Sequence, residues 1–136
     1  MLEKSCGTIP YTKKNEEIYY LLIKIKENGY CGFPKGHMES GENEQETALR
    51  ETWEETSIQV QLRTGFRYEL SYRMPGGNQK NVVYFLADFG DQLPANNEGF
   101  ENFDYLILSF EEAVNTLTFE NSRQMLKEAH QFMLTA

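Results

Sequence analysis

Glu51, Glu54 and Glu55 are the residues whose types and spacing point most directly to chemistry. On an α-helix, at about 100° per residue, they fall within about 100° of one another and place three carboxylates on one face. Like charges at this spacing destabilise a helix, so stability alone does not favour the pattern. Clustered carboxylate oxygens are ligands for Mg²⁺ or Mn²⁺, whose shell is completed by substrate phosphate oxygens. A solvated acidic helix face is the alternative interpretation.

The helix that carries these carboxylates is expected to run from about Asn43 to Thr56, with Asn43 as its N-cap. Its opposite face is expected to pack against a sheet and comprises Leu49, Thr52, Trp53 and Thr56. Arg50 adjoins Glu51 and can orient a carboxylate by a bidentate contact, for which Glu42 is a candidate partner. The helix is therefore predicted to have one acidic face and an opposite face that packs against the sheet.

Composition and charge narrow the class of protein. The chain has 136 residues, and we expect them to form one domain, 1–136, with a single hydrophobic core. Nine Phe and eight Tyr argue against disorder. A net charge of −8 argues against nonspecific or stable DNA binding. If the substrate is itself anionic, a divalent cation held by carboxylates would neutralise the mutual repulsion.

The sequence also predicts a location. The N-terminal residues MLEKSCGTIPY lack the apolar run of a secretory signal, and no stretch approaches the length of a membrane span. Cys6 and Cys31 are then best interpreted as reduced thiols. We therefore expect a cytoplasmic protein without membrane attachment and without an obligate protein partner.

Hydrophobic patterning predicts alternating strands and helices. Strands are expected at 6–13, 17–26, 58–63, 65–73, 81–89 and 105–108, with the first two forming a hairpin. Loops are expected at 28–40 and 90–103. After a capping box of Ser109 and Glu112 comes a short helix, and a last helix at 121–134 carries an apolar stripe. This order of elements predicts an α+β domain with α/β/α layers and a mixed sheet.

The segment from Gly36 to Ile58, GHMESGENEQETALRETWEETSI, resembles the Nudix box. That box is a Gly, five residues, a Glu, seven residues, then Arg-Glu-apolar-any-Glu-Glu-any-Gly-apolar. The positions that match in register are Gly36, Glu42, Arg50, Glu51, Glu54, Glu55 and Ile58. Two positions depart: Thr52 stands where an aliphatic residue is usual, and Ser57 replaces the closing Gly, where a left-handed residue is expected. Neither departure removes a carboxylate.

The resemblance extends over nearly the whole chain. FPKGHMESGE, GFRYELSY, VVYFLADF and FEEAVNTLTFENSRQMLKEAHQF are similar to segments of asymmetrically cleaving dinucleoside tetraphosphate hydrolases, a Nudix branch that splits diadenosine tetraphosphate into ATP and AMP. The likeness implies the Nudix fold, an α/β/α sandwich with a mixed sheet, in which the box forms a loop-helix-loop. It also implies a nucleoside polyphosphate substrate and Mg²⁺ as cofactor, with Mn²⁺ as the alternative ion.

The resemblance also implies roles for individual residues. The implied metal ligands are the Gly36 carbonyl, Glu51, Glu54, Glu55 and Glu101, with Glu98 as the alternative to Glu101. Arg50 joins these glutamates in the catalytic set, and one of Glu51, Glu55 and Glu101 would take a proton from the attacking water. The implied substrate contacts are Lys35, His37 and Lys80 to phosphates and Tyr84 to the adenine ring.

Other functions remain open at the level of sequence. The box chemistry is shared by enzymes that act on nucleoside triphosphates or on the 5′-triphosphate end of RNA. A non-catalytic Nudix module that binds nucleotides is a further alternative. Such a module would be marked by lost box carboxylates, and all of them are present here. The sequence therefore favours a hydrolase.

Overall fold

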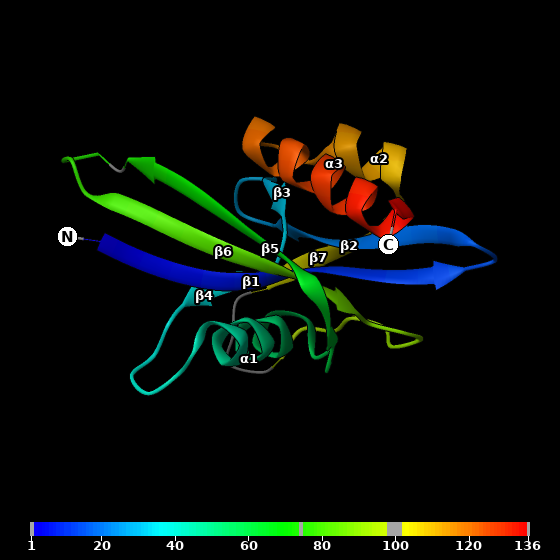
Figure 1. Cartoon of the computed structure of the whole chain (residues 1–136), viewed down its shortest axis with the longest axis horizontal. Coiled ribbons are helices and arrows are strands. Elements are labelled where there is room, and N and C mark those ends of the chain that lie inside the picture. The colour runs from blue at the N-terminus through cyan, green and yellow to red at the C-terminus, as the bar shows by residue number, and fades with distance from the viewer. Residues whose placement is uncertain (1, 74, 98–101, 136) are drawn as a thin grey trace.

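The computed structural model describes residues 2–73, 75–97 and 102–135 of the chain. In chain order its elements are β1 (Leu2–Lys14), β2 (Glu17–Ile25), β3 (Cys31–Gly32), β4 (Lys35–His37), α1 (Glu44–Thr56), β5 (Gln61–Arg73), β6 (Gln79–Asp88), β7 (Phe103–Ser109), α2 (Phe110–Thr116) and α3 (Glu120–Thr135). Helices α2 and α3 cover one face of the sheet and α1 covers the other (Figure 1). The expected α/β/α layers are confirmed.

The described strands form one mixed sheet of seven, in which β1 changes its partner along its length. One edge of β1 pairs with β6 in parallel from Leu2 to Tyr11. The other edge pairs with β4 near Cys6 and with β2 only from Tyr11 onward, both antiparallel. Asn15 and Glu16 close the β1–β2 hairpin with positive φ angles of 51° and 70°. Because β2 and β4 share one edge of β1, the sheet divides between them.

Two expectations about the strands are corrected. Residues 28–40 were expected to form a loop, but they contain the two-residue β3 and the three-residue β4. Segments 58–63 and 65–73 were expected as separate strands, but β5 is one strand from Gln61, with a register shift between Arg63 and Arg67. Gly65 lies in this irregularity at φ 99°, and such a bulge bends a strand without ending it. The short strands β3 and β4 form because β2 and β1 offer them pairing partners, and local sequence patterns do not reveal such pairing.

Alternating residues of β6 contribute to hydrophobic clusters on both faces of the sheet. Val82, Tyr84 and Leu86 pack on the side of α3, whereas Val83 and Phe85 pack on the side of α1. Helix α3 contributes a buried stripe that comprises Met125, Leu126, Ala129 and Met133, with Phe132 partly buried beside it. This stripe confirms the expected core face. None of the described helices is long and apolar enough to cross a bilayer.

The packed face of α1 differs from the expected one. Its buried residues are Thr47, Ala48, Thr52 and Thr56, whereas Trp53 is 43% exposed and Leu49 is 36% exposed. The expectation that Trp53 and Leu49 pack against the sheet is therefore wrong. Small side chains at positions 48, 52 and 56 let the helix approach the sheet closely, and a large residue there would hold it away. The helix is rotated accordingly, which also determines where its glutamates point.

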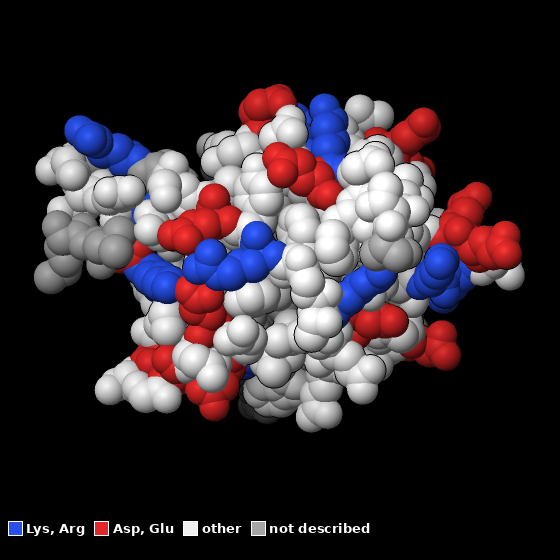
Figure 2. Space-filling model, viewed as in Figure 1, with Lys and Arg blue, Asp and Glu red and all other residues white. Residues whose placement is uncertain are grey.

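Acidic and basic side chains interleave across the visible face instead of forming one patch of either sign (Figure 2). A chain of ion pairs links Lys4 to Glu44, Glu44 to Arg67 and Arg67 to Glu69. Arg67 donates two hydrogen bonds to Glu44, at 2.9 and 2.8 Å. These bonds hold the pKa of Glu44 at about 2 and fasten the first turn of α1 to the sheet.

Candidate active site

The ends of α1 are fixed by its own sequence. Asn43 caps the N-terminus through a capping box with Glu46, in which each side chain accepts a hydrogen bond from the backbone of the other. At the other end Ser57 adopts the left-handed conformation with φ 63°, as expected for the position of the usual glycine. Its hydroxyl donates to the Ala95 carbonyl at 2.9 Å, a contact that glycine could not make.

Thr52, the second departure from the box, has a buried hydrogen-bond partner. Its hydroxyl lies 2.7 Å from the hydroxyl of Thr8 on β1, and it also donates to the Ala48 carbonyl at 2.8 Å. Because Thr52 donates to Ala48, the proton between the two threonines comes from Thr8. The polar residue thus replaces apolar packing with a bond between the helix and the central strand.

Arg50 organises the acidic face of α1. Its guanidinium donates to Glu42 at 2.6 and 3.1 Å, to Glu51 at 2.8 Å and to Glu54 at 3.0 Å. It also donates to the His37 carbonyl at 2.9 Å, which ties β4 to the helix. The pairing with Glu42 that the sequence suggested is confirmed. Hydrogen bonds from Arg50 lower the pKa of Glu42 to about 2, so this carboxylate is ionised and holds the guanidinium in place.

Gly36 allows the Glu51 carboxylate to lie directly against the backbone of β4. A Cβ atom at position 36 would lie 2.0 Å from the carboxyl carbon of Glu51 and 2.1 and 2.4 Å from its oxygens. The side chain of Glu51 is 14% exposed. Burial, followed by the nearby charge of Glu54, raises the pKa of Glu51, while Arg50 opposes this shift. The structure therefore brings together Gly36 and Glu51, two of the predicted metal ligands.

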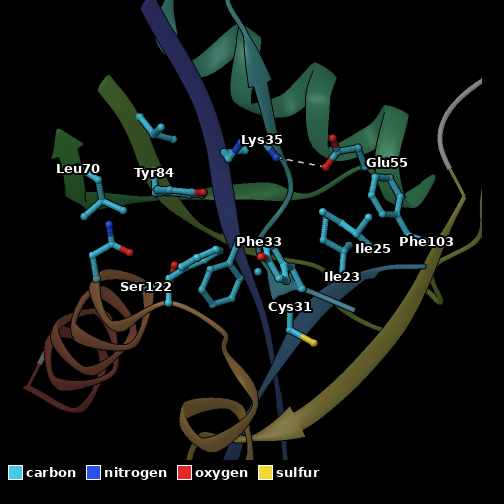
Figure 3. Close-up of a pocket in the computed structure, with 15 residues that line it drawn as sticks. Ile23, Ile25, Cys31, Phe33, Lys35, Glu55, Leu70, Tyr84, Phe103 and Ser122 are labelled. Atoms are coloured by element: carbon cyan, nitrogen blue, oxygen red, sulfur yellow. Dashed lines mark hydrogen bonds between the residues drawn. The ribbon is translucent and has the colours of Figure 1, made fainter. Parts of the chain in front are cut away.

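Glu55 points to a different place from Glu51 and Glu54. Its Oε1 accepts a hydrogen bond from the backbone N–H of Lys35 at 3.2 Å, and both residues line a pocket (Figure 3). Burial is the main reason that the pKa of Lys35 is lowered, and the nearby charge of Lys80 adds to the effect. Lys35 thus offers an ammonium group near the carboxylate of Glu55.

The pocket has a volume of about 550 Å³, within the usual range for small-molecule sites. It lies where the sheet divides: Ile23 and Ile25 of β2 are beyond the pairing with β1, and Lys35 belongs to β4. Its lining comprises Ile23, Ile25, Tyr30, Cys31, Gly32, Phe33, Lys35, Glu55, Leu70, Val82, Tyr84, Phe103, Phe119, Asn121 and Ser122. The pocket therefore joins an aromatic and apolar chamber to the acidic helix.

Tyr84 forms part of this chamber. Its ring makes an edge-on contact with Phe33, with centroids 6.3 Å apart and planes at 71°. Figure 3 shows Tyr84 and Leu70 on one side, and Ser122 enters from the start of α3. Tyr84 is only 5% exposed, so it serves both the core and the pocket wall. Both interpretations of a strand tyrosine, core residue and ring contact for a ligand, are compatible with this position.

Comparison with known proteins agrees with this geometry. Residues 1–129 match the family model of the NUDIX domain. The chain belongs to the NUDIX hydrolase family. It is 36% identical to the asymmetrical bis(5′-nucleosyl)-tetraphosphatase of Mus musculus and 35% identical to that of Sus scrofa, each match covering 98% of this chain and 97% of the relative. A crystal structure of a Caenorhabditis elegans Ap4A hydrolase binary complex superposes with a TM-score of 0.88 at 25% identity and covers 98% of this chain and 99% of that one.

The acidic face of this NUDIX hydrolase fits the divalent metal ions that the family uses. Carboxylate and backbone oxygens are hard ligands, and the space at Gly36 keeps the Glu51 carboxylate at the β4 backbone. Among the described residues, however, no three acidic, His or Cys side chains are already gathered around one point. One oxygen each of Glu51 and Glu54 accepts a hydrogen bond from Arg50, and one oxygen of Glu55 accepts a hydrogen bond from the Lys35 backbone N–H. The residue types fit the ion, and Arg50 holds Glu51 and Glu54 near one another, while Glu55 is held at Lys35.

The remaining predicted site residues are only partly brought together. Lys80 of β6 lies near enough to Lys35 to affect its pKa, but it is outside the set of described residues that line the pocket. The imidazole of His37 is 65% exposed and lies 3.6 Å from Glu3, so its backbone carbonyl is what contacts the site. Glu98 and Glu101 lie outside the described residues, and the role of Glu101 stays a prediction.

Several residues of the site were not identified from the sequence. Thr8 supports α1 from β1, and Phe33 and Phe103 form pocket walls. Phe33 lies two positions before Lys35 in FPKG, so its place beside the box was a usable signal. Thr8 gave no signal, because its partner is 44 residues away.

Proposed function

We propose that this NUDIX hydrolase cuts a phosphoanhydride bond of dinucleoside polyphosphates, with diadenosine tetraphosphate converted to ATP and AMP in the presence of Mg²⁺. The observation that carries the proposal is that Tyr84, Lys35 and Glu55 line the same pocket. A nucleoside held beside Tyr84 would direct its phosphates toward Lys35 and the carboxylates. The mouse and pig relatives, whose names specify asymmetrical tetraphosphatases, support this substrate class.

In the proposed reaction, the oxygen of one water molecule forms a bond to a phosphorus atom as the bridging P–O bond on the opposite side breaks. The departing nucleotide keeps the bridging oxygen. A bound divalent ion would lower the pKa of that water and neutralise charge on the phosphate oxygens. Gly36, Glu51, Glu54 and Glu55 would hold the ion, and Glu101 is proposed to join them. The described residues on both sides of Glu101 support this, since Asn97 and Tyr105 each donate a hydrogen bond to a carbonyl in the last turn of α1.

Each described residue has a task in this scheme. Arg50 holds Glu51 and Glu54 at a fixed separation against their mutual repulsion. Lys35 contributes positive charge to the phosphates, which a chain of net charge −8 needs at the point of contact. Of the three box glutamates, Glu55 lines the pocket, so we favour it as the proton acceptor, with Glu51 and Glu101 as alternatives. Action in the cytoplasm without an obligate partner stays a prediction from the sequence.

Product analysis with purified protein tests the proposal. Diadenosine tetraphosphate and Mg²⁺ should yield ATP and AMP, faster than products form from GTP, diadenosine triphosphate or triphosphorylated RNA. Glu55→Gln should abolish the activity, because the amide cannot take the proton. Glu111→Gln, which changes an exposed glutamate on α2, serves as the matched control and should retain it. Faster turnover of another substrate would leave the hydrolase in place and overturn the substrate.

A further inference from the structure

The C-terminal end of α1 is capped by a distant part of the chain. The last four carbonyls of a helix have no partner within the helix. In α1 they belong to Trp53, Glu54, Glu55 and Thr56. The C-cap Ser57 N–H donates to the Trp53 carbonyl at 2.8 Å, and Ala95, Asn97 and Tyr105 between them donate a hydrogen bond to each of the four. Asn97 Nδ2 donates to Trp53 at 2.6 Å and to Glu54 at 3.0 Å, Tyr105 Oη donates to Glu55 at 2.5 Å, and the Ala95 N–H donates to Thr56 at 2.9 Å.

This end of the helix needs such donors more than most. The C-terminus of a helix carries a partial negative charge, which basic side chains usually offset. The last turn of α1 contains no basic residue and carries Glu54 and Glu55. Helix dipole and carboxylates therefore add to the same negative potential. Without outside donors the last turn would tend to unwind, and the two side chains would lose their fixed origin.

The residues that cap α1 are themselves held in place by their neighbours. Asn96 Nδ2 donates to the Phe103 carbonyl at 3.1 Å, and the Phe103 N–H donates back to Asn96 Oδ1 at 2.7 Å. Tyr105 Oη also lies 3.3 Å from Asn96 Oδ1. Phe103 is 3% exposed and lines the pocket. Hydrogen bonds among Asn96, Phe103 and Tyr105 thus support the donors on Asn97 and Tyr105, which can hold the helix end in one position.

We propose that Asn97 and Tyr105 are positioning residues that fix the backbone of Glu54 and Glu55 so that their carboxylates meet a divalent ion and substrate in one geometry. The inference rests on the proposed function for the identity of that ion and substrate. It goes beyond the proposed function, because it states that two side chains outside the Nudix box hold the glutamates of the box in place. Asn97 is not part of the described pocket lining, so its effect should reach the ion and the chemical step more than substrate affinity.

The test compares Asn97→Ala and Tyr105→Phe with Gln92→Ala. Gln92 is the matched control because it also lies between β6 and β7 and its amide makes hydrogen bonds to Gln59 and Phe89. It does not contact a carbonyl of α1. Mn²⁺ affinity is measured by electron paramagnetic resonance without nucleotide, and kcat and KM are measured with Mg²⁺. Asn97→Ala and Tyr105→Phe should each weaken Mn²⁺ binding and lower kcat by about 10-fold, with KM within about twofold. Gln92→Ala should lower thermal stability and leave the Mn²⁺ affinity unchanged.

The two residues are merely structural if their variants melt at lower temperature but keep wild-type Mn²⁺ affinity and kcat. Equal losses of affinity in Gln92→Ala would also overturn the proposal, since the effect would then be general to the connection. Tyr105→Phe removes one hydroxyl and keeps the ring, so it provides a folded variant if Asn97→Ala does not fold. A wild-type protein that binds Mn²⁺ but does not cut diadenosine tetraphosphate would refute the proposed substrate while leaving this inference to be judged on affinity.

Discussion

Replacing Gly36 by alanine should separate catalysis from folding. The added methyl would lie 2.0 Å from the carboxyl carbon of Glu51, whereas an ordinary contact is about 3.5 Å. The carboxylate must therefore retreat by about 1.5 Å, because it is the end of a flexible side chain and the backbone of β4 is paired with β1. Misplacement by about 1 Å in a catalytic group can cost about 100-fold in rate. We expect kcat to fall by at least about 100-fold, with a change in Tm of only about 2 °C.

Two other substitutions provide the controls for this prediction. Glu111 is exposed on α2 and lies outside the lining of the pocket, so Glu111→Ala should keep kcat within about twofold of wild type. At Gly7 the added Cβ would lie 2.0 Å from the Pro34 carbonyl oxygen, which is backbone, so Gly7→Ala should disrupt the fold. Steady-state kinetics and thermal melts of all three variants form the assay. If Gly36→Ala retains kcat, or melts as early as Gly7→Ala, the reasoning about the Glu51 carboxylate is refuted.

Three further changes test the site and its supports. Lys35→Met should lower kcat/KM by about 100-fold through loss of phosphate charge stabilisation; steady-state kinetics would show it, and an unchanged value would remove Lys35 from the site. Thr52→Val should lower the free energy of unfolding by about 1–2 kcal/mol in urea titrations, because the Thr8 hydroxyl is left unpaired, and adding Thr8→Val should restore most of it. Glu44→Gln should lower the free energy of unfolding by about 1 kcal/mol at pH 7. The effect is this small because Arg67 is 45% exposed and solvent screens the ion pair. Because folding lowers the pKa of Glu44 from 4.5 to about 2, that difference should be present above pH 4.5 and disappear as pH falls toward 2; an equal loss at pH 7 and pH 2 would contradict it.

Local signals predicted the helix ends and the acidic face well. Asn43 and Ser109 were identified as caps from residue type and spacing, and both form capping boxes in the structure. The three glutamates share a helix with Arg50, as their periodicity indicated. These features depend on residues within one or two turns of each other. The physical interactions that create them are therefore contained in a short stretch of sequence.

Features that depend on contacts between distant segments were not predicted. The rotation of α1 is decided by close packing of Ala48 and Thr52 on the sheet, and hydrophobicity alone pointed to Leu49 and Trp53. Strands β3 and β4 are too short to show a pattern, and they exist because β1 and β2 offer them partners. The capping of α1 by Asn97 and Tyr105 joins residues more than 40 positions apart. No periodicity in the sequence encodes such pairs.

The rotation of α1 directs its three glutamates to two different places. Position 55 lies close to the line of 48, 52 and 56 on the helix, so its side chain reaches past the sheet edge into the pocket beside Lys35. Glu51 and Glu54 lie further round the helix and share the guanidinium of Arg50 instead. A helix packed through Leu49 and Trp53, as hydrophobicity suggested, would turn Glu55 away from the pocket. The small residues on the buried face thus allow one helix to present Glu55 to the pocket while Glu51 and Glu54 contribute to the proposed ion site.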